Sequence, residues 1–345
     1  MNQFGASLRV RNVNEALPVA LQMIQTYGKP AESRGLKTLR VHGPVTTIYE
    51  RPEERVLFDA VRDANPFFHL IESLWILGGS NRVELPRMFL GNIDRFSDDG
   101  VTFHGAYGHR LRKAFGFDQI IRAIELLVTK PDTRQCVMSI WHPELDMRAN
   151  TKDMPCNDMI MLDIVDGRLN MTVCNRSNDA IWGAYGANAV QFSMLQEFIA
   201  IYAKLERGFY VQQSNNFHVY VDNPFWLAFN EGRHEYGHVT NPYERGEVQA
   251  RPIAQNTMDA VLLLADCEGM CAQVENGEHL ESFEYHSSFG QTVVSPVVRA
   301  YNLYKLKCYA SALKVLEEVA AEDWRLAMKQ WVQRRADKAT TKEQA

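Results

Sequence analysis

Cysteine is scarce in this chain of 345 residues, with six in all, at positions 136, 156, 174, 267, 271 and 308. Six cysteines are too few for a disulfide scaffold at this length, so a reducing cytoplasm is the expected location. No apolar stretch approaches the ~18–20 residues that cross a bilayer, and the N-terminus lacks the continuous apolar segment of a secretory signal. Hydrophobic residues make up 46% and charged residues 23%, a globular composition that excludes fibrous and disordered classes.

An excess of charge of one sign is also lacking. The chain has 37 Lys+Arg against 42 Asp+Glu, and its formal net charge is -5. Because there is no long basic run, we do not expect the protein to coat a nucleic-acid backbone. A membrane partner is not expected either, since no segment is suited to one.

Three ligand-binding motifs are missing or incomplete. The Walker loop and the G-x-G-x-x-G turn are absent. His142-Pro143-Glu144 followed by Pro155-Cys156 imitates part of the zinc deaminase signature, but its second cysteine should fall where Met159 stands. Since a catalytic zinc ion needs three protein ligands and two are present, the sequence predicts no metal site.

Helical and strand-like segments mix without regular βαβ order, which favours an α+β fold. Asp166-Gly167 between two strand-like runs predicts a hairpin turn. No linker separates domains, so we expect one catalytic domain over 1–335 with extra C-terminal helices, and a flexible tail over 336–345. The predicted helices are 13–27, 66–78, 188–206 and most of the last ~50 residues. The predicted strands are 38–41, 45–49, 134–141, 159–165, 169–174 and 211–221.

Cys156 follows Met154-Pro155 at the edge of a predicted strand. A free cysteine is commonly a small buried hydrophobe, whereas a thiol beside cations becomes a reactive thiolate. The next hairpin strand ends in Arg176-Ser177-Asn178-Asp179. Adjacent Arg and Ser can hold a phosphate through charge-assisted hydrogen bonds, and the arginine would favour a nearby thiolate. Taken alone, the tetrad is equally compatible with a solvated loop.

Seven short segments occur in one order along the chain: Glu32-Ser33-Arg34-Gly35, Glu72 to Gly79, Gly105-Ala106-Tyr107-Gly108, Asp132-Thr133-Arg134-Gln135, Pro155-Cys156, Asn175 to Gly183 with Asn188, and Phe217-His218-Val219-Tyr220. In this order they resemble the core of the thymidylate synthase family, which includes the pyrimidine nucleotide hydroxymethylases. The resemblance implies a mixed β-sheet that is covered by helices and used in a homodimer interface.

The resemblance also implies the catalytic residues. Cys156 would be the nucleophile, whose thiolate adds to carbon 6 of a uracil ring so that carbon 5 can attack a one-carbon unit. N5,N10-methylenetetrahydrofolate would supply that unit. Glu72 would act as a general acid/base near O4 and carbon 5, and Tyr107 would support removal of the carbon 5 proton. Outside the family context, Glu72 could be a helix-surface carboxylate and Tyr107 a packing residue.

Ligand contacts follow from the same resemblance. The implied substrate-binding residues are Arg34, Arg134, Arg176, Ser177, Asn188, His218 and Tyr220, and the residues facing the folate are Asp179, Gly183 and Phe96. Arg134 would reach the nucleotide phosphate from the partner subunit, which implies a homodimer. His218 and Tyr220 would hold the sugar 3′-hydroxyl, although a strand histidine such as His218 is as often a satisfied core residue.

Choice of base depends on Asn188. An amide can accept from uracil N3–H and donate to O4 at once, whereas cytosine presents the opposite pattern and cytosine-specific relatives carry an acid there. Asn188 lies one position later, relative to Asp179, than the synthase pattern expects. We therefore place a one-residue insertion within Ala184-Tyr185-Gly186-Ala187.

The fate of the one-carbon unit separates two enzyme types. Synthases close the site with an apolar C-terminal tail and bulky tryptophans, but this chain ends in Lys342-Glu343-Gln344-Ala345 and carries Phe96 as the nearest aromatic counterpart. The R-S-N-D tetrad also resembles phage-type hydroxymethylases. Because water exclusion protects reactive intermediates, a wetter pocket favours a deoxyuridylate (dUMP) 5-hydroxymethylase. The alternatives are a thymidylate synthase, a deoxycytidylate (dCMP) hydroxymethylase and a non-catalytic nucleotide-binding module.

Overall fold

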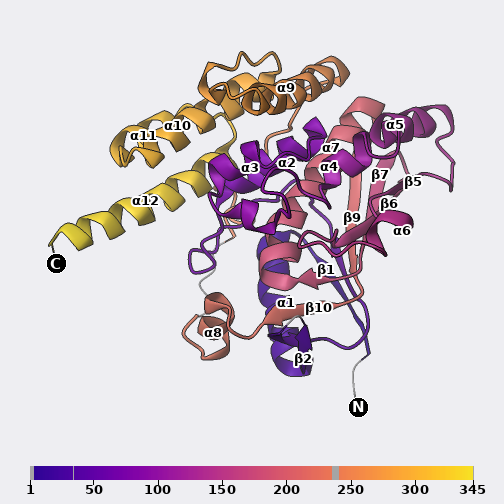
Figure 1. Cartoon of the computed structure of the whole chain (residues 1–345), viewed down its shortest axis with the longest axis horizontal. Helices are drawn as coiled ribbons and strands as arrows, with labels where there is room; N and C mark the ends of the chain where they lie inside the picture. Colours follow the sequence, from indigo (N-terminus) through magenta and orange to yellow (C-terminus); the bar gives the residue numbers. More distant parts are fainter. Residues whose placement is uncertain (1–3, 34, 235–240, 345) are drawn as a thin grey trace.

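In the computed structural model, the chain folds into two mixed β-sheets that are covered by helices (Figure 1). The structure describes residues 4–33, 35–234 and 241–344. The larger sheet has the strand order β1 (Ala6–Val10), β4 (Val45–Tyr49), β9 (Glu206–Ser214), β7 (Arg168–Asn175), β6 (Asn157–Val165), β5 (Val137–Ser139). The smaller sheet has the order β2 (Lys29–Ser33), β3 (Leu36–Arg40), β10 (Phe217–Tyr220), β8 (Asn178–Asp179). Both sheets contain parallel and antiparallel pairs, as the predicted α+β class requires.

The α-helices are α1 (Val13–Tyr27), α2 (Pro66–Gly78), α3 (Glu84–Phe89), α4 (Tyr107–Arg112), α5 (Gln119–Thr129), α6 (Pro143–Asp146), α7 (Ala189–Ala203), α8 (Pro224–Asn230), α9 (Thr257–Glu275), α10 (Ser295–Lys305), α11 (Tyr309–Leu316) and α12 (Glu322–Gln344). Short 3-10 turns are η1 (Ile93–Phe96) and η4 (Leu280–Ser282), and π-helical segments are η2 (Ala180–Asn188) and η5 (Gly290–Val294).

The β6–β7 hairpin follows directly from its sequence. Asp166 and Gly167 both have positive φ, at 51° and 74°, as a tight two-residue hairpin turn requires. In β6 the side chains alternate, so that Ile160 and Leu162 are buried while Met159 and Met161 are exposed on the other face. The predicted hairpin is therefore confirmed, and it has one covered and one open face.

Helix α2 is buried around almost its whole circumference. The Asn65 side chain caps its first turn by accepting from Phe68 N at 3.2 Å, and Gly79 ends it in the left-handed conformation at φ 66°. Helices α7, α9 and α12 all pack against it. A helix that is apolar all round needs such enclosure, and Glu72 is its one acidic residue.

Three predicted elements differ from the structure. The predicted strand 134–141 is ordered as a strand only over β5, and the helix predicted over 188–206 ends at Ala203, before Lys204 at φ 59°. The strand predicted over 211–221 is wrong, because the chain leaves the larger sheet at Ser214 and joins the smaller one at Phe217. Alternating hydrophobicity marks extended chain but does not show that the pairing partner changes.

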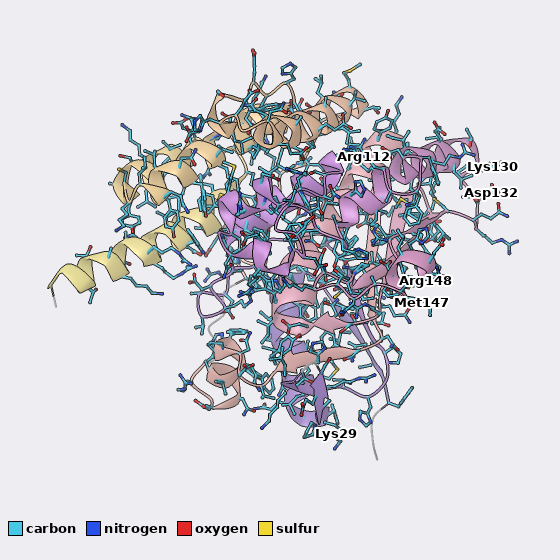
Figure 2. All side chains as sticks on the ribbon, in the orientation of Figure 1. Lys29, Arg112, Lys130, Asp132, Met147 and Arg148 are labelled. Atoms are coloured by element: carbon cyan, nitrogen blue, oxygen red, sulfur yellow. The ribbon has the colours of Figure 1, made fainter. Side chains whose placement is uncertain are left out.

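The C-terminal helices α9 to α12 form a layer along one side of the molecule, and α12 projects from it (Figure 1). Cys267 and Cys271 lie one turn apart on α9, as predicted, and are buried against Gly78, where an added Cβ would lie 2.6 Å from Cys267 O. Arg112, labelled in Figure 2, ties this layer to the core by bonding Leu77 O at 2.7 Å and Glu268 at 2.7 Å. Helix α12 continues to Gln344, within the segment predicted as a flexible tail.

Candidate active site

Cys156 lies immediately before β6, directly beside Arg176 at the end of β7. The backbone N–H of Arg176 donates to Cys156 O at 3.0 Å. Its guanidinium donates to Pro155 O at 2.8 Å and Met154 O at 2.9 Å, and Nη2 lies 3.8 Å from the Cys156 thiol. The hairpin therefore brings the predicted nucleophile and the predicted phosphate arginine into contact.

Glu72 projects from the buried helix α2 with one oxygen, Oε2, fully buried and without a hydrogen-bond partner among the described residues. Burial raises the pKa of Glu72 to about 7, the Gln191 amide opposes this, and the charge of Asp153 adds to it. A carboxyl group with a pKa near neutrality can both give and take a proton at physiological pH. Its environment therefore suits general acid/base work.

Tyr107 begins α4 and lies close to the same groups. The backbone of α4 touches α2 here, since a Cβ on Gly108 would lie 2.2 Å from Ile76 O. Burial raises the pKa of Tyr107 well above its ordinary value, and the nearby charges of Cys156, Asp153 and Glu72 raise it further. The fold thus gathers the three predicted catalytic residues from three separate segments.

Asn188 closes η2 and is buried beside Gln191. Its Nδ2 donates to Gln191 Oε1 at 3.0 Å. A Cβ on Gly183 would lie 2.5 Å from Asn178 Oδ1 and 3.5 Å from Asn188 Oδ1, so the glycine allows both amides to approach the backbone. The hydrogen bonds of a π-helix span five residues, one more than in an α-helix, and η2 is wound in this way over the segment in which the sequence suggests an insertion.

His218 and Asp179 are register partners on the neighbouring strands β10 and β8. Burial lowers the pKa of His218, while the charge of Asp179 opposes that change. The Asp179 carboxylate caps η2 by accepting from Trp182 N at 3.0 Å and Ile181 N at 3.2 Å. The ring of His218 meets that of Tyr220 edge-on, with centroids 5.3 Å apart. The two predicted sugar contacts therefore lie together beside the predicted folate contact.

The remaining predicted residues are placed differently. Ser177 lies next to Arg176 and is partly exposed, while Phe96 ends η1 with 38% of its surface exposed and the Arg95 guanidinium 4.7 Å from its ring centre. Arg134 is exposed on the loop between α5 and β5, and Figure 2 shows Lys130 and Asp132 of that loop at the outer edge of the molecule. Arg34 lies outside the described residues.

Sequence reasoning missed polar groups around Cys156. Gln191 contacts both Asn188 and Glu72. It lies about one helical turn after Asn188 in the sequence, and this spacing could have identified it as a site residue. Asn157 is fully buried, and its side chain lies within hydrogen-bonding reach of Tyr107. Burial raises the pKa of Asp158 to about 6, against the opposing charge of Arg176. Asp158 Oδ1 is a buried atom without a hydrogen-bond partner among the described residues, and a ligand can complete such a group.

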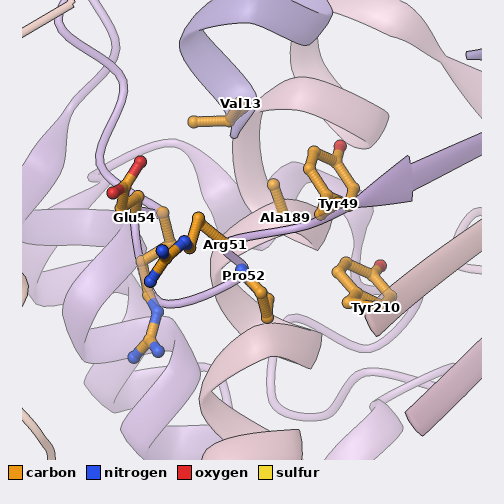
Figure 3. Close-up of a pocket in the computed structure, with 8 residues that line it drawn as sticks. Val13, Tyr49, Arg51, Pro52, Glu54, Ala189 and Tyr210 are labelled. Carbon is orange, nitrogen blue, oxygen red and sulfur yellow. The ribbon is translucent and has the colours of Figure 1, made fainter. Parts of the chain in front are cut away.

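The residues drawn in Figure 3 line a gap that includes none of the predicted site residues. There the rings of Tyr49 and Tyr210 stack at 5.2 Å beside Val13 and Ala189, and the remaining gap is too small for a water molecule. This cluster belongs to the core.

His142, the first residue of the incomplete zinc signature, has a structural role. Its side chain caps α6 by accepting from Leu145 N at 3.3 Å and stacks on Phe115. Within the described ranges, no three His, Cys, Asp or Glu side chains are grouped to hold a metal ion. Over the same ranges, no helix is both long and apolar enough to cross a bilayer.

Comparison with known proteins agrees with this geometry. The family model for thymidylate synthase matches residues 20–260. The chain therefore belongs to the thymidylate synthase family, a family of one-carbon transferases that use methylenetetrahydrofolate and act on dUMP. The family resemblance and the predicted folate-dependent transfer to a pyrimidine nucleotide are thereby confirmed.

Individual relatives refine the position within the family. The chain is 40% identical over 342 residues to a deoxyuridylate hydroxymethyltransferase of Pseudomonas phage M6, covering 95% of this chain and 94% of that protein. It is 39% identical over 198 residues to the enzyme of the same name from Bacillus phage SP01, covering 54% and 52%. Thymidylate synthase from T4 phage shares the fold, with a TM-score of 0.53 and 20% identity over 63% of this chain and 80% of that one.

Proposed function

We propose that this protein is a deoxyuridylate 5-hydroxymethyltransferase, which converts dUMP, methylenetetrahydrofolate and water into 5-hydroxymethyl-dUMP and tetrahydrofolate. The observation that carries the proposal is the 40% identity to the phage M6 enzyme over 95% of the chain. Because the alignment covers 95% of the chain, the similarity extends beyond residues 20–260, which the family model matches. The similarity to this relative therefore includes part of the chain that lies outside the general family pattern.

Arg176 is suited to bind the phosphate of dUMP. Two of its guanidinium nitrogens are held by the loop carrying Cys156, and among the described residues no acceptor takes the third, Nη1. Ser177 is adjacent and partly exposed. A phosphate bound here would place the nucleotide over the Cys156 thiol, with Asn188 as the reader of uracil N3–H and O4 and with His218 and Tyr220 at the sugar 3′-hydroxyl.

The chemical roles follow from the surroundings of each side chain. The Cys156 thiolate adds to carbon 6 of uracil, and the nearby Arg176 guanidinium favours its negative charge. Glu72, with a pKa near 7, moves protons at O4 and carbon 5. Tyr107 stays protonated because its pKa is far above neutrality, so it acts as a hydrogen-bond donor beside the reacting carbon.

The folate is assigned to the side of the pocket that Asp179 and Gly183 form. The absence of a side chain at Gly183 lets Asn178 Oδ1, a buried acceptor with no partner among the described residues, lie close to the backbone beside Asp179. An N–H donor of the folate would complete this acceptor. Phe96, half exposed, offers an apolar surface to the same ligand.

One incubation tests the proposal. With dUMP and methylenetetrahydrofolate, the expected product has the mass of 5-hydroxymethyl-dUMP, and no dihydrofolate absorbance appears because tetrahydrofolate leaves unoxidised. A methyl product with stoichiometric dihydrofolate would show a thymidylate synthase instead. Turnover of dCMP in preference to dUMP would show that Asn188 does not read the base.

The open face of the larger sheet supports the homodimer that the family resemblance implies. Apolar side chains on this face remain accessible, namely those of Val137, Met159, Met161 and Phe209. A partner covering them would bring a second copy of the exposed Arg134 loop to a phosphate site. Mixing Arg134→Ala with Cys156→Ser protein should restore activity through subunit exchange. A monomer in sedimentation at working concentration would contradict the homodimer.

A further inference from the structure

Asp153 is a half-buried acidic residue near the candidate catalytic groups, and the roles above leave it unused. It lies three residues before Cys156, on the loop that meets the segment carrying Tyr107. Its Oδ2 accepts from the backbone N–H of Gly105 at 2.7 Å. The two segments touch closely, since a Cβ on Gly105 would lie 2.6 Å from Asp153 O and 2.9 Å from Pro155 N. The Asp153 carboxylate is therefore held at a fixed place on the loop that carries Cys156.

The second oxygen, Oδ1, accepts no hydrogen bond from the residues that the structure describes. The charge of Asp153 is nevertheless felt by both Glu72 and Tyr107, whose pKa values it raises. A carboxylate with one oxygen anchored and the other without a donor among the described residues can accept a proton from a bound water. Asp153 thus has an acceptor oxygen to spare, and its charge acts on two of the candidate catalytic groups.

Several charged groups around Asp153 set its ionisation. Burial raises its pKa to about 6, the Gly105 N–H lowers it, and the more distant charges of His104, Asp98 and Arg110 oppose one another. The charge of Asp153 in turn raises the pKa of Glu72. At pH 7 to 8 the group is therefore mostly an anion, yet its basicity exceeds that of an exposed aspartate. A general base works best with a pKa just below the working pH.

We propose that Asp153 is the general base that activates the water molecule which adds to the exocyclic methylene on carbon 5. This inference depends on the proposed hydroxymethyltransferase function. The water oxygen bonds to the methylene carbon, and one water proton passes to the Asp153 carboxylate. The electron pair of the exocyclic double bond moves into the ring as the O4 enolate. When that enolate collapses, the ring double bond re-forms, Cys156 leaves as thiolate, and Asp153 later returns its proton to solvent.

The other carboxyls of the pocket are less suited to this step. Glu72 is contacted by the Gln191 amide and serves the protons at O4 and carbon 5. Asp158 faces the positive charge of Arg176, which reduces its basicity. Asp153 combines an anchored oxygen, a second oxygen that is available and, among the residues that the structure describes, no cation in an ion pair with it.

Asp153→Asn is the decisive variant, because the amide oxygen can still accept from Gly105 N–H while the base is lost. Single turnovers with dUMP and methylenetetrahydrofolate should still release the carbon 5 hydrogen to solvent, as in the parent enzyme. Formation of 5-hydroxymethyl-dUMP should fall about 100-fold, the size of a typical general-base contribution. Added 2-mercaptoethanol should then trap the methylene as a thioether, detected by mass, and the rise of product formation through pH 6 should disappear.

Asp98→Asn is the matched control. Asp98 holds the same loop by bonding Thr151 Oγ1 and accepting from Lys152 N at 3.0 Å, so its loss loosens the loop without removing the base. It should leave the ratio of thioether to hydroxymethyl product close to that of the parent enzyme, because Asp98 affects the pKa of Asp153 less than burial and the Gly105 N–H do.

Two results separate the inference from the function on which it depends. If the parent enzyme forms 5-hydroxymethyl-dUMP and Asp153→Asn forms it at the same rate, the assignment of Asp153 is wrong and the proposed function stands. Loss of carbon 5 hydrogen release in Asp153→Asn would also overturn it, because the residue would then be needed before water attack. A methyl product from the parent enzyme would overturn the proposed function itself.

Discussion

Carboxylates in the C-terminal layer and in the candidate active site differ in how many hydrogen bonds they accept. In the C-terminal layer, Asp266 accepts from His286 N at 2.9 Å, Ser287 N at 2.9 Å and Ser287 Oγ at 2.6 Å. Asp259 accepts from Ser288 N and Gln255 N, both at 2.8 Å. In the pocket, Glu72 Oε2 has no partner among the described residues, and Asp153 is held through a single backbone N–H.

The same difference is visible in their acidity. Burial acts to raise the pKa of Asp259, but the hydrogen bonds from Ser288 and Gln255 outweigh it, so the pKa is lowered. Burial prevails at Glu72 and Asp153, whose pKa values rise to about 7 and about 6. Carboxylates that receive a full set of donors stabilise the fold, whereas incompletely bonded ones are available for chemistry.

Cys156→Ser should produce the largest effect. Turnover and carbon 5 hydrogen exchange should both fall by on the order of 10⁴-fold or more, because a serine hydroxyl is a far weaker nucleophile at neutral pH. Cys308→Ser, at an exposed position in the C-terminal layer, should match the parent enzyme in both assays. Near-normal exchange in Cys156→Ser would refute covalent catalysis by this residue.

Glu72→Gln should lower turnover by about 10² to 10⁴-fold, since the proton-transfer group is lost. Although Glu72→Gln lowers turnover, it should raise the stability of the folded protein at high pH. The Glu72 pKa is raised in the folded protein from 4.5 to about 7, so wild-type stability falls as pH rises through that window. Glu72→Gln removes this slope, and thermal denaturation at pH 5 and pH 8 should show a relative gain at pH 8. Equal differences at the two pH values would contradict the buried, titrating carboxyl.

Asn188→Asp should change the choice of base by roughly 10². The carboxylate cannot donate to uracil O4, which leaves an acceptor facing an acceptor, whereas it can accept from the amino group of cytosine. Steady-state turnover of dUMP should fall and that of dCMP should rise. If both nucleotides lose activity equally, the residue supports Gln191 rather than reading the base.

Asp259→Ala should give the smallest effect, and on stability alone. Removing the carboxylate leaves the N–H groups of Ser288 and Gln255 without their acceptor, at a cost of about 2 kcal/mol in the free energy of unfolding. That loss should vanish in acid, because the wild-type advantage disappears as pH falls through the lowered pKa of Asp259. Denaturant titration checks the loss of stability and its disappearance in acid. Unchanged turnover at 25 °C checks that the effect is confined to stability.

The sequence predicted much of the local structure, because local structure depends on neighbours in the chain. The apolar spacing in residues 66–78 predicted α2, and the structure has Pro66–Gly78. The Asp166-Gly167 turn predicted the β6–β7 hairpin. The split of residues 206–220 into strands of two sheets was not predictable, since each half has the same extended pattern and only the pairing partner differs.

For the site, the order of motifs along the chain determined the family and the identity of Cys156, Glu72, Tyr107 and Asn188 as candidates. Their chemistry was decided by the tertiary structure, because a pKa depends on burial and on charges that are distant in sequence. Asp153 shows this most clearly: in the sequence it is an ordinary loop aspartate, and only the folded structure desolvates it, which raises its pKa to about 6, and anchors it to Gly105 N–H.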